Sequence, residues 1–201
     1  MMLIRPPEPS ERGVVSELIL QSDCGLLTAL FGAEVCLLLT HLQSKPSNPY
    51  SSSNILVIAD QTMSPSIVGA LVGSRMDEAR RSNLRAAALL FRWYGSAVIT
   101  RFSRLARAGR VLEGLGPADF YLSHIAVLPE RRGRGAGRDL LRAGEQRARK
   151  QGATRLVLDV EAGNGGARSF YDRLDYRLLS VVRIDLGRRG TFSFLRLCKG
   201  L

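Results

Sequence analysis

The sequence predicts an α/β fold in which one sheet carries helices on both faces. The first observation is composition: of 201 residues, 45% are apolar and 23% are charged. These values suit one compact domain with a sizeable core, and they exclude disordered, collagenous and coiled-coil proteins. The second observation is that short apolar runs alternate with helical stripes after residue 120. We therefore expect a single domain over residues 1–201.

The first part of the chain predicts a strand followed by two helices. Residues 3–5 are expected to form the strand, which the following prolines end. Residues 11–22 and 24–43 are expected to form the helices. The apolar stripe of the second helix consists of Leu26, Leu27, Leu30, Phe31, Val35, Leu38 and Leu42.

A loop and a hairpin are expected next. Residues 44–54 are rich in Ser and Pro, which favours a loop. Residues 55–59 and 67–72 are apolar and rich in β-branched side chains, and a polar turn joins them. We interpret them as a hairpin of buried strands.

Residues 78–119 form a basic helical insertion between the third and fourth expected strands. Eight arginines and no acidic residue lie between positions 80 and 110, so this segment holds +8 of the formal net charge of +11. Apolar residues recur at helical spacing, with a break near Gly95. In one interpretation Leu84, Phe91, Val98 and Phe102 are core and the arginines are solvated. In the other, the insertion is a lid or wall that attracts an acidic substrate.

The last part of the chain shows clear β/α alternation. The expected elements are a strand at 120–128, a helix at 136–151, a strand at 154–160, a helix at 165–174, and strands at 176–186 and 191–197.

Cysteine and histidine usage argues against a metal site. Cys24, Cys36 and Cys198 are widely spaced, which favours reduced, buried thiols over disulfides or zinc ligands. The first residues contain prolines and Glu8 where a secretion signal needs an apolar run. The apolar stretch 24–40 contains Glu34 and two glycines, which favours a core helix over a membrane span. We expect a cytoplasmic protein without integral membrane association and without a metal.

The sharpest motif is the stretch IAVLPERRGRGAG at residues 125–137, where a strand runs into a glycine-rich turn that opens a helix. Free N–H groups and the positive dipole end at a helix start can hold phosphate. Arg131, Arg132, Arg134 and Arg138 add positive charge, so the turn predicts a pyrophosphate site. The spacing fits neither a P-loop nor a Rossmann turn. The alternative is a tight loop without a ligand.

A second motif, NGGARSFYDRLDY, covers residues 164–176. Asn164 is a favourable N-cap, and Ala167, Phe170, Tyr171 and Leu174 share one helical stripe. From this motif alone, Tyr171 is as well interpreted as a core aromatic.

Together the two motifs, in the order strand, R-x-x-G-x-G, helix, strand, N-x-x-A-x-x-F-Y, resemble the GNAT superfamily of acetyl-CoA-dependent N-acyltransferases over residues 122–176. The resemblance implies a mixed, mostly antiparallel twisted sheet of six to seven strands flanked by helices. It also implies transfer of an acetyl group from acetyl-CoA to a primary amine by direct attack. Asp175 is a departure, because relatives usually have glycine there, and a left-handed residue costs more for Asp.

The resemblance implies roles for the matching residues. The pyrophosphate of CoA would lie on Arg132, Gly133, Arg134, Gly135, Ala136 and Gly137, with Arg138 beside them. Ile125, Ala126 and Val127 would meet the thioester and the pantetheine arm, and Asn164 and Ala167 would contact the cofactor. Tyr171 would protonate the departing thiolate.

The general base has three candidates. Asp159 is the first, because it precedes Tyr171 by 12 residues, a spacing at which the similar subgroup that acetylates protein N-termini carries a glutamate. Glu161 shares a strand face with Asp159. His124 adjoins the expected oxyanion strand and is expected to titrate near neutrality. In the alternative interpretation, Asp159 and Glu161 are solvent-facing strand residues and His124 has a structural role.

A second class of function stays open at this stage. The chain could be a CoA-binding regulatory or nucleic-acid-associated module without turnover, and the insertion could also meet an anionic membrane surface. For the enzyme we expect an acceptor that is acidic if the insertion attracts it, and no nucleic-acid partner. The sequence leaves open a homodimer.

Overall fold

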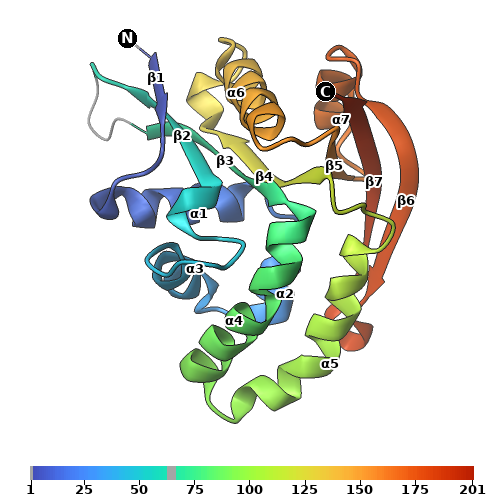
Figure 1. Cartoon of the computed structure of the whole chain (residues 1–201). Helices are drawn as coiled ribbons and strands as arrows, with labels where there is room; N and C mark the ends of the chain where they lie inside the picture. The colour runs from blue at the N-terminus through green and yellow to red at the C-terminus, as the bar shows by residue number, and fades with distance from the viewer. Residues whose placement is uncertain (1, 63–66) are drawn as a thin grey trace.

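The computed structural model describes residues 2–62 and 67–201, without the side chains of Asn83, Leu84, Thr100, Phe102 and Arg110. Its strands are β1 (Met2–Arg5), β2 (Ile55–Asp60), β3 (Ile67–Arg75), β4 (Asp119–Val127), β5 (Arg155–Glu161), β6 (Arg177–Asp185) and β7 (Thr191–Gly200). They form one twisted seven-stranded sheet in the order β1-β2-β3-β4-β5-β7-β6 (Figure 1). Every neighbouring pair is antiparallel except β4 and β5, which are parallel. The predicted mixed, mostly antiparallel sheet is confirmed.

Helices cover both faces of this sheet, as predicted. One face carries α1 (Arg12–Ser22), α2 (Leu26–Phe31) and α3 (Val35–Gln43), and the other carries α6 (Ala136–Lys150) and α7 (Gly165–Asp172) (Figure 1). Successive strand residues point to opposite faces. In β3, for example, Ala70 packs in the core under α1 and α3, and Leu71 packs in the core under α6 with Leu140. Both Ala70 and Leu71 are almost fully buried.

The expected single helix over residues 24–43 is wrong, because the chain breaks between α2 and α3. Gly32 has a φ of +88°, and its N–H donates to the carbonyl of Thr28 and so ends α2. A left-handed residue cannot continue a right-handed helix, and glycine adopts this conformation at little cost. The predicted stripe still marks the buried face, since Leu27, Leu30 and Leu38 are all buried.

The basic segment between β3 and β4 forms α4 (Met76–Tyr94) and α5 (Ala97–Gly109). Gly95, between them, has a φ of +56°, so the break lies where the sequence predicts it. The two helices extend away from the sheet, beyond α2 (Figure 1).

The predicted core face of these helices is wrong at Phe91, which is 58% exposed. Val98 is only half-buried, and the side chains of Leu84 and Phe102 lie outside the described part of the structure. Because α4 and α5 project beyond the sheet, the apolar stripe at Phe91 has no surface to cover.

Strands β4 and β5 separate at one end, which creates the opening for a site. Their pairing runs from Asp119 opposite Arg155 to Leu122 opposite Leu158. Beyond that point β4 stays paired with β3 as far as Val127, and β5 stays paired with β7 as far as Glu161. The backbone edge of β4 after Leu122 therefore faces an opening instead of a strand.

Within the described part of the chain, no helix combines the length and the apolar character needed to cross a membrane. The same part holds no group of three or more His, Cys, Asp or Glu residues placed to bind a metal ion.

Candidate active site

A cleft of about 1030 Å³ lies where β4 and β5 diverge. Its walls come from the connection between α1 and α2, the turn before α6, the start of α7 and the end of α5. The cleft brings together nearly all predicted site residues. They are His124, Ile125, Ala126, Val127, Arg132, Gly133, Gly135, Ala136, Gly137, Arg138, Asp159, Glu161, Asn164, Ala167 and Tyr171. Arg134 is the exception, since it does not line the cleft.

The glycine turn leaves an open cradle at the start of α6. Gly133 and Gly135 have φ values of +74° and +91°, and a Cβ atom built on either would meet nothing within 4 Å. Gly135 is the N-cap of α6, and no side chain caps this end. The N–H groups of the first helical turn therefore remain available to an anion.

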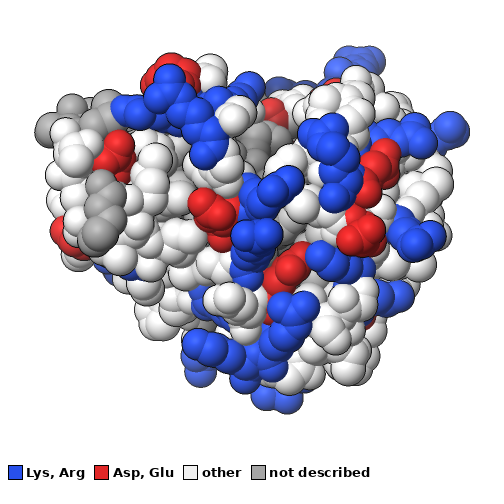
Figure 2. Space-filling model, turned by 90° about the horizontal axis from the view of Figure 1, so that it is seen from above, with Lys and Arg blue, Asp and Glu red and all other residues white. Residues whose placement is uncertain are grey.

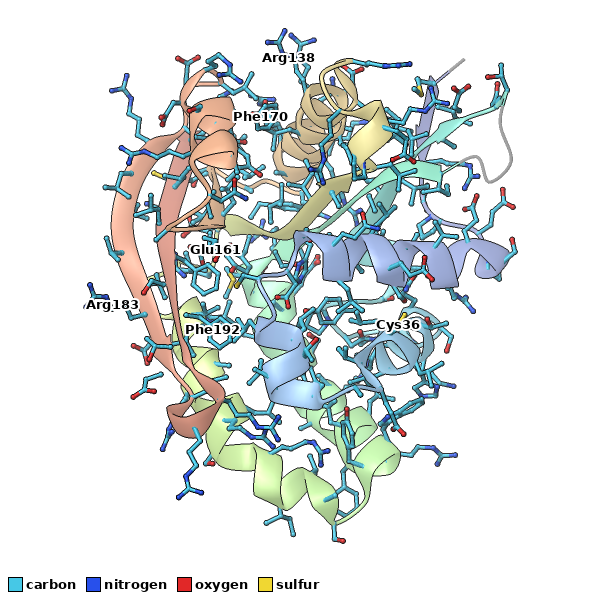
Figure 3. All side chains as sticks on the ribbon, turned by 180° about the vertical axis from the view of Figure 1, so that it is seen from behind. Cys36, Arg138, Glu161, Phe170, Arg183 and Phe192 are labelled. Carbon is cyan, nitrogen blue, oxygen red and sulfur yellow. The ribbon has the colours of Figure 1, made fainter. Side chains whose placement is uncertain are left out.

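Gly137 sits where α6, α7 and β4 approach one another. A Cβ atom there would lie 3.7 Å from Phe170 Cζ and 3.8 Å from Val127 Cγ2. Figure 3 shows Phe170 on α7, turned toward α6, and Arg138 near the start of α6. The Nε of Arg132 donates to the carbonyl of Val127 at 3.0 Å and fixes the turn against the strand.

The backbone of β4 presents hydrogen-bonding groups to the opening at alternate residues. In an antiparallel pair, alternate residues exchange hydrogen bonds with the partner strand and the others face away. The N–H of Leu128 donates to Val68 in β3, so Ala126, opposite Ala70, also bonds to β3. The backbone groups of Ile125 and Val127 therefore face the opening. Ala126 also lines the cleft, but its backbone hydrogen-bonding groups face β3 instead of the opening.

Tyr171 combines burial with a phenol that stays protonated. Its ring packs edge-on against Phe170 and Tyr176, with centroid distances of 5.1 and 5.5 Å. Burial raises the pKa of the Tyr171 phenol well above its usual range. Its hydroxyl has no hydrogen-bond partner among the described residues, although it lines the cleft. The side chain is a core aromatic that also lines the cleft.

The ends of α7 are built as the sequence predicts. Asn164 caps the helix, because its side-chain oxygen accepts from the N–H of Ala167 at 3.0 Å. Asp175 has a φ of +64°, the left-handed conformation expected at this position. The N–H of Tyr176 then donates to the carbonyl of Tyr171 at 3.1 Å. The turn therefore forms with Asp in place of Gly.

Asp159 is engaged in a buried ion pair. Its two carboxylate oxygens accept from Nε and Nη2 of Arg196, each at 2.8 Å, and Oδ2 also accepts from the hydroxyl of Tyr121 at 2.9 Å. Both partners are nearly inaccessible, with side chains 6% and 3% exposed. Protonation of Asp159 would disrupt this pair. The pairing therefore argues against the first candidate for the base.

Glu161, at the end of β5, is the exposed carboxylate of the cleft. It has no hydrogen-bond or ion-pair partner among the described residues, and Figure 3 labels it at the opening. Its charge is close enough to Asp23 to raise the pKa of that carboxyl, although burial is the larger cause. Of the two predicted carboxylates, Glu161 is the one free to accept a proton.

The expectation that His124 titrates near neutrality is wrong. Burial lowers the pKa of its imidazole to about 4. Nδ1 lies 3.2 Å from Ser22 Oγ, and Nε2 lies 3.2 Å from the Tyr50 hydroxyl. Because Ser22 donates its own proton to the carbonyl of Ile19, Nδ1 must donate and Nε2 must accept from Tyr50. Both ring nitrogens are occupied, so His124 is a fixed, neutral part of the wall.

Several residues of the cleft carry no local sequence signal. Tyr121 reaches Asp159 from a neighbouring strand, as does Arg196 behind the cleft wall. Ser22 comes from the end of α1, and Asp23 and Tyr50 come from loops. Their proximity depends on the order of the strands. Only Asp23, which precedes a short helix like an N-cap, could have been noticed. The three cysteines have free thiols, and each is partly exposed instead of buried.

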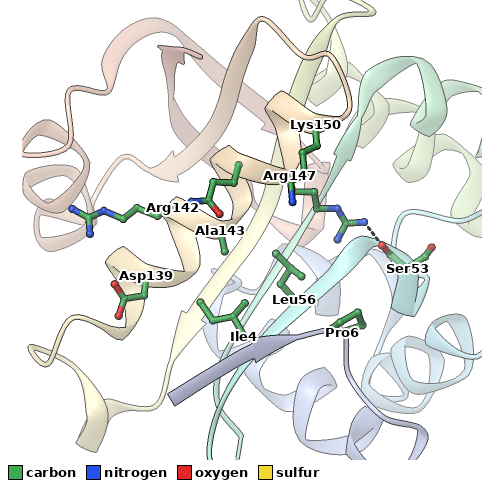
Figure 4. A pocket seen from close by; sticks show the side chains of 10 residues that line it. Ile4, Pro6, Ser53, Leu56, Asp139, Arg142, Ala143, Arg147 and Lys150 are labelled. Carbon is green, nitrogen blue, oxygen red and sulfur yellow. Dashed lines mark hydrogen bonds between the residues drawn. The ribbon is translucent and has the colours of Figure 1, made fainter. Parts of the chain in front are cut away.

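A second hollow of about 610 Å³ lies between α6 and strands β1 and β2 (Figure 4). Basic side chains of α6 surround it, and Arg147 donates to the carbonyl of Ser53. It contains none of the predicted catalytic residues, so the cleft between β4 and β5 is the better candidate.

The chain resembles known proteins in both sequence and structure. Residues 66–176 match the model of the acetyltransferase (GNAT) family. N-alpha-acetyltransferase 30 of Schizosaccharomyces pombe is 36% identical over 76 residues, which is 37% of this chain and 51% of that protein. The chain thus spans about half the length of this curated relative.

Solved structures resemble the whole chain. An N-acetyltransferase from Staphylococcus aureus Mu50 superimposes with a TM-score of 0.68 at 14% identity, covering 98% of this chain and all of the other. A polyamine N-acetyltransferase from Drosophila melanogaster gives 0.64 at 17% identity, covering both chains fully. The ribosomal-protein-S18-alanine N-acetyltransferase from Escherichia coli gives 0.58 at 13%, covering 100% and 94%. At these identities the likeness concerns the fold.

Proposed function

Because the chain belongs to the acetyltransferase (GNAT) family, we propose that it transfers an acetyl group from acetyl-CoA to a primary amine by direct attack. One observation carries the proposal. The opening between β4 and β5 joins the uncapped glycine turn, the free backbone edge of β4 and the protonated Tyr171 in one cleft.

Acetyl-CoA fits this cleft by charge and by space. The turn at residues 132–137 offers backbone N–H groups to a pyrophosphate, and the open space at Gly133 and Gly135 lets phosphate oxygens approach closely. Arg138 adds a positive charge at the same end. The pantetheine arm would then run along β4 beside Ile125 and Val127, with Asn164 and Ala167 on the facing wall.

The transfer needs a neutral amine, a stabilised oxyanion and a protonated leaving group. A lysine-type amine costs roughly 4 to 5 kcal/mol to deprotonate at pH 7, and an α-amine only about 1 kcal/mol. Acetyl-CoA supplies the activated carbonyl and the thiolate leaving group. Glu161 accepts the proton of the amine, and the N–H groups of Ile125 and Val127 stabilise the oxyanion. Tyr171 donates its proton to the sulfur as the carbon–sulfur bond breaks.

The testing experiment measures release of free CoA thiol from acetyl-CoA in the presence of a panel of amines. The panel includes peptide N-termini, since the yeast relative is named an N-alpha-acetyltransferase, and simple alkylamines. Mass spectrometry must find one acetyl group added to the amine. CoA binding without turnover, together with salt-sensitive RNA binding, would instead support a regulatory or nucleic-acid-associated module.

Some expectations stay predictions. They are the cytoplasmic location, the homodimer, the absence of a metal and the acidic acceptor. The last was based on the basic insertion, yet none of its arginines from Arg80 to Arg107, whose side chains the structure describes, lines the cleft. The chemistry of the acceptor must therefore be inferred from the residues that line the cleft.

A further inference from the structure

We propose that the acceptor is a cationic amine on a slender apolar body, held between Asp23 and Glu161 and against an apolar wall that the insertion helps to build. This inference rests on the proposed acetyl transfer and names its substrate class. Asp23 is among neither the predicted catalytic residues nor the predicted cofactor-binding residues.

Charges of both signs line the cleft. The cationic side chains are Arg131, Arg132, Arg138 and Arg173, which belong to the glycine turn, the start of α6 and the end of α7. The carboxylates of Asp23, Asp159 and Glu161 line the same cleft, and Figure 3 shows Glu161 well away from Arg138. Arg196 neutralises Asp159, so two carboxylates remain. The anionic cofactor and a cationic acceptor are thereby favoured in different parts of the cleft.

Asp23 lines the same cleft as Glu161 and is held in place by backbone hydrogen bonds. Its Oδ2 accepts from the N–H groups of Gly25 and Leu27 at 3.0 and 2.9 Å, which fixes the side chain at the start of α2. Its other oxygen has no hydrogen-bond partner among the described residues. Burial, followed by the charges of Asp23 and Glu161, raises the pKa of the adjacent Cys24 thiol to about 11. The local field is thus negative, and a cation between the two carboxylates would relieve their repulsion.

An apolar wall lies beside Glu161, since Phe194 pairs with it across β5 and β7. Leu30 and Phe31 of α2, Ala108 of α5, Val111 and Phe194 pack into one cluster, and all five line the cleft. Arg196 holds the segment after α5 in place by donating to the carbonyls of Val111 and Glu113, the latter at 2.8 Å. This wall offers apolar contact and no cation to the body of the acceptor.

Three arginines of the insertion are engaged by other groups, and none of the three lines the cleft. Arg104 donates to the carbonyl of Ala29 at 2.9 Å, and Arg85 donates to Ser47 at 2.7 Å. Arg101 stacks over the ring of Tyr94 at 4.2 Å. Arg85 and Arg104 thus attach the insertion to neighbouring elements and Arg101 joins its two helices, while apolar residues of the insertion, such as Ala108 and Val111, line the cleft. The acidic acceptor expected from the net charge is therefore the opposite of what the cleft favours.

The test compares three acceptors of matched length: hexylamine, 1,6-diaminohexane and 6-aminohexanoate. Hexylamine is a cation on an apolar chain, and 6-aminohexanoate adds a carboxylate at the far end. We expect a KM for 6-aminohexanoate at least tenfold higher than for hexylamine. An equal or lower KM for 6-aminohexanoate overturns the proposal. 1,6-Diaminohexane tests whether the apolar wall accepts a second cation. A KM for the diamine tenfold below that of hexylamine would overturn the proposal that the body of the acceptor is apolar.

The key variant is Asp23→Asn, since the amide oxygen can still accept from Gly25 and Leu27. We expect the KM for hexylamine to rise about tenfold, with kcat and the KM for acetyl-CoA changed less than threefold. Asp172→Asn is the matched control, because Asp172 is an exposed carboxylate outside the cleft. An unchanged hexylamine KM in Asp23→Asn overturns the proposal.

Failure of the proposed function can be told apart from failure of this inference. If no amine is acetylated, hexylamine binding is measured by calorimetry in the presence of CoA. Binding that Asp23→Asn weakens would support the cationic subsite without the transfer. Absence of binding would overturn the subsite as well.

Discussion

Tyr171 belongs to the core and, under the proposed function, also to the chemistry. Its ring packs edge-on against Phe170 and Tyr176, and the residue lines the cleft. The raised pKa keeps the phenol protonated at neutral and mildly alkaline pH. A donor with a raised pKa stays protonated but is a weaker acid, so we expect a modest contribution from Tyr171 to the departure of the thiolate.

Tyr171→Phe should lower kcat by about 10² and leave the KM for acetyl-CoA within twofold. General acid catalysis typically contributes 10² to 10⁴, and a thiol with pKa about 8.5 is already a fair leaving group, so the low end is expected. Steady-state thiol release measures both constants. A variant with the wild-type kcat would reduce Tyr171 to a packing residue.

His124 should make the protein less stable in acid. The pKa of its imidazole falls from an ordinary 6.5 to about 4 in the folded state. The unfolded chain therefore binds a proton below pH 6.5 that the folded chain refuses. Stability falls as the pH drops from 6.5 toward 4, by on the order of 2 to 3 kcal/mol, and is unaffected above this window.

Urea denaturation at pH 7 and pH 4.5 measures the effect, with His124→Gln as the control. The variant should lose less stability between the two pH values than the parent does. An equal loss in both proteins would show that carboxylates alone cause the acid sensitivity.

Asp159 marks the limit of sequence reasoning at the level of single residues. Its position near the site followed from its spacing to Tyr171, and the structure does place it in the cleft. Its partner Arg196 lies on β7, which pairs with β5 only because of the strand order. No local pattern indicates such a pairing, so its effect on the base could not be predicted.

At the scale of elements, the sequence predicts structure correctly where the backbone conformation depends on residues that are adjacent in sequence. The glycine turn, the Asn164 cap and the left-handed Asp175 depend on neighbours in sequence, and all three form as expected. The stripe at Phe91 failed because helical spacing cannot say whether a surface exists to cover it. The break at Gly32 was missed because the stripe continues across it.

The glycine turn provides a matched pair of variants that separates strain from charge. At Gly135, with a φ of +91°, any other L-residue is strained. Gly135→Ala adds this strain alone, and Gly135→Asp adds the same strain and a negative charge where phosphate must approach. We expect calorimetry to show CoA affinity at least tenfold weaker in Gly135→Asp than in Gly135→Ala. Equal affinities in two folded variants would remove the pyrophosphate from this turn.

At the scale of the whole molecule, charge and shape give different indications about the acceptor. Lys and Arg side chains crowd much of the face seen from above, with Asp and Glu between them (Figure 2). A net charge of +11 would favour an anionic acceptor at long range. The cleft nevertheless contains the carboxylates of Asp23 and Glu161, which favour a cation under the proposal above. The molecule as a whole should therefore repel a cation that its site binds.

The opposition between the net positive charge of the molecule and the carboxylates of its cleft predicts the effect of one multiple variant. In this variant Arg85, Arg92, Arg101 and Arg104 are changed together to glutamine. At low ionic strength the repulsion of a cationic acceptor should weaken, so the KM for hexylamine should fall about two- to threefold. The difference from wild type should vanish at high salt, because exposed charges act through screened fields. The stability of the variant must be checked, since Arg85 and Arg104 hold neighbouring elements. If the KM for hexylamine instead rises at low salt, the insertion attracts the acceptor, and the acidic substrate predicted from the sequence regains support.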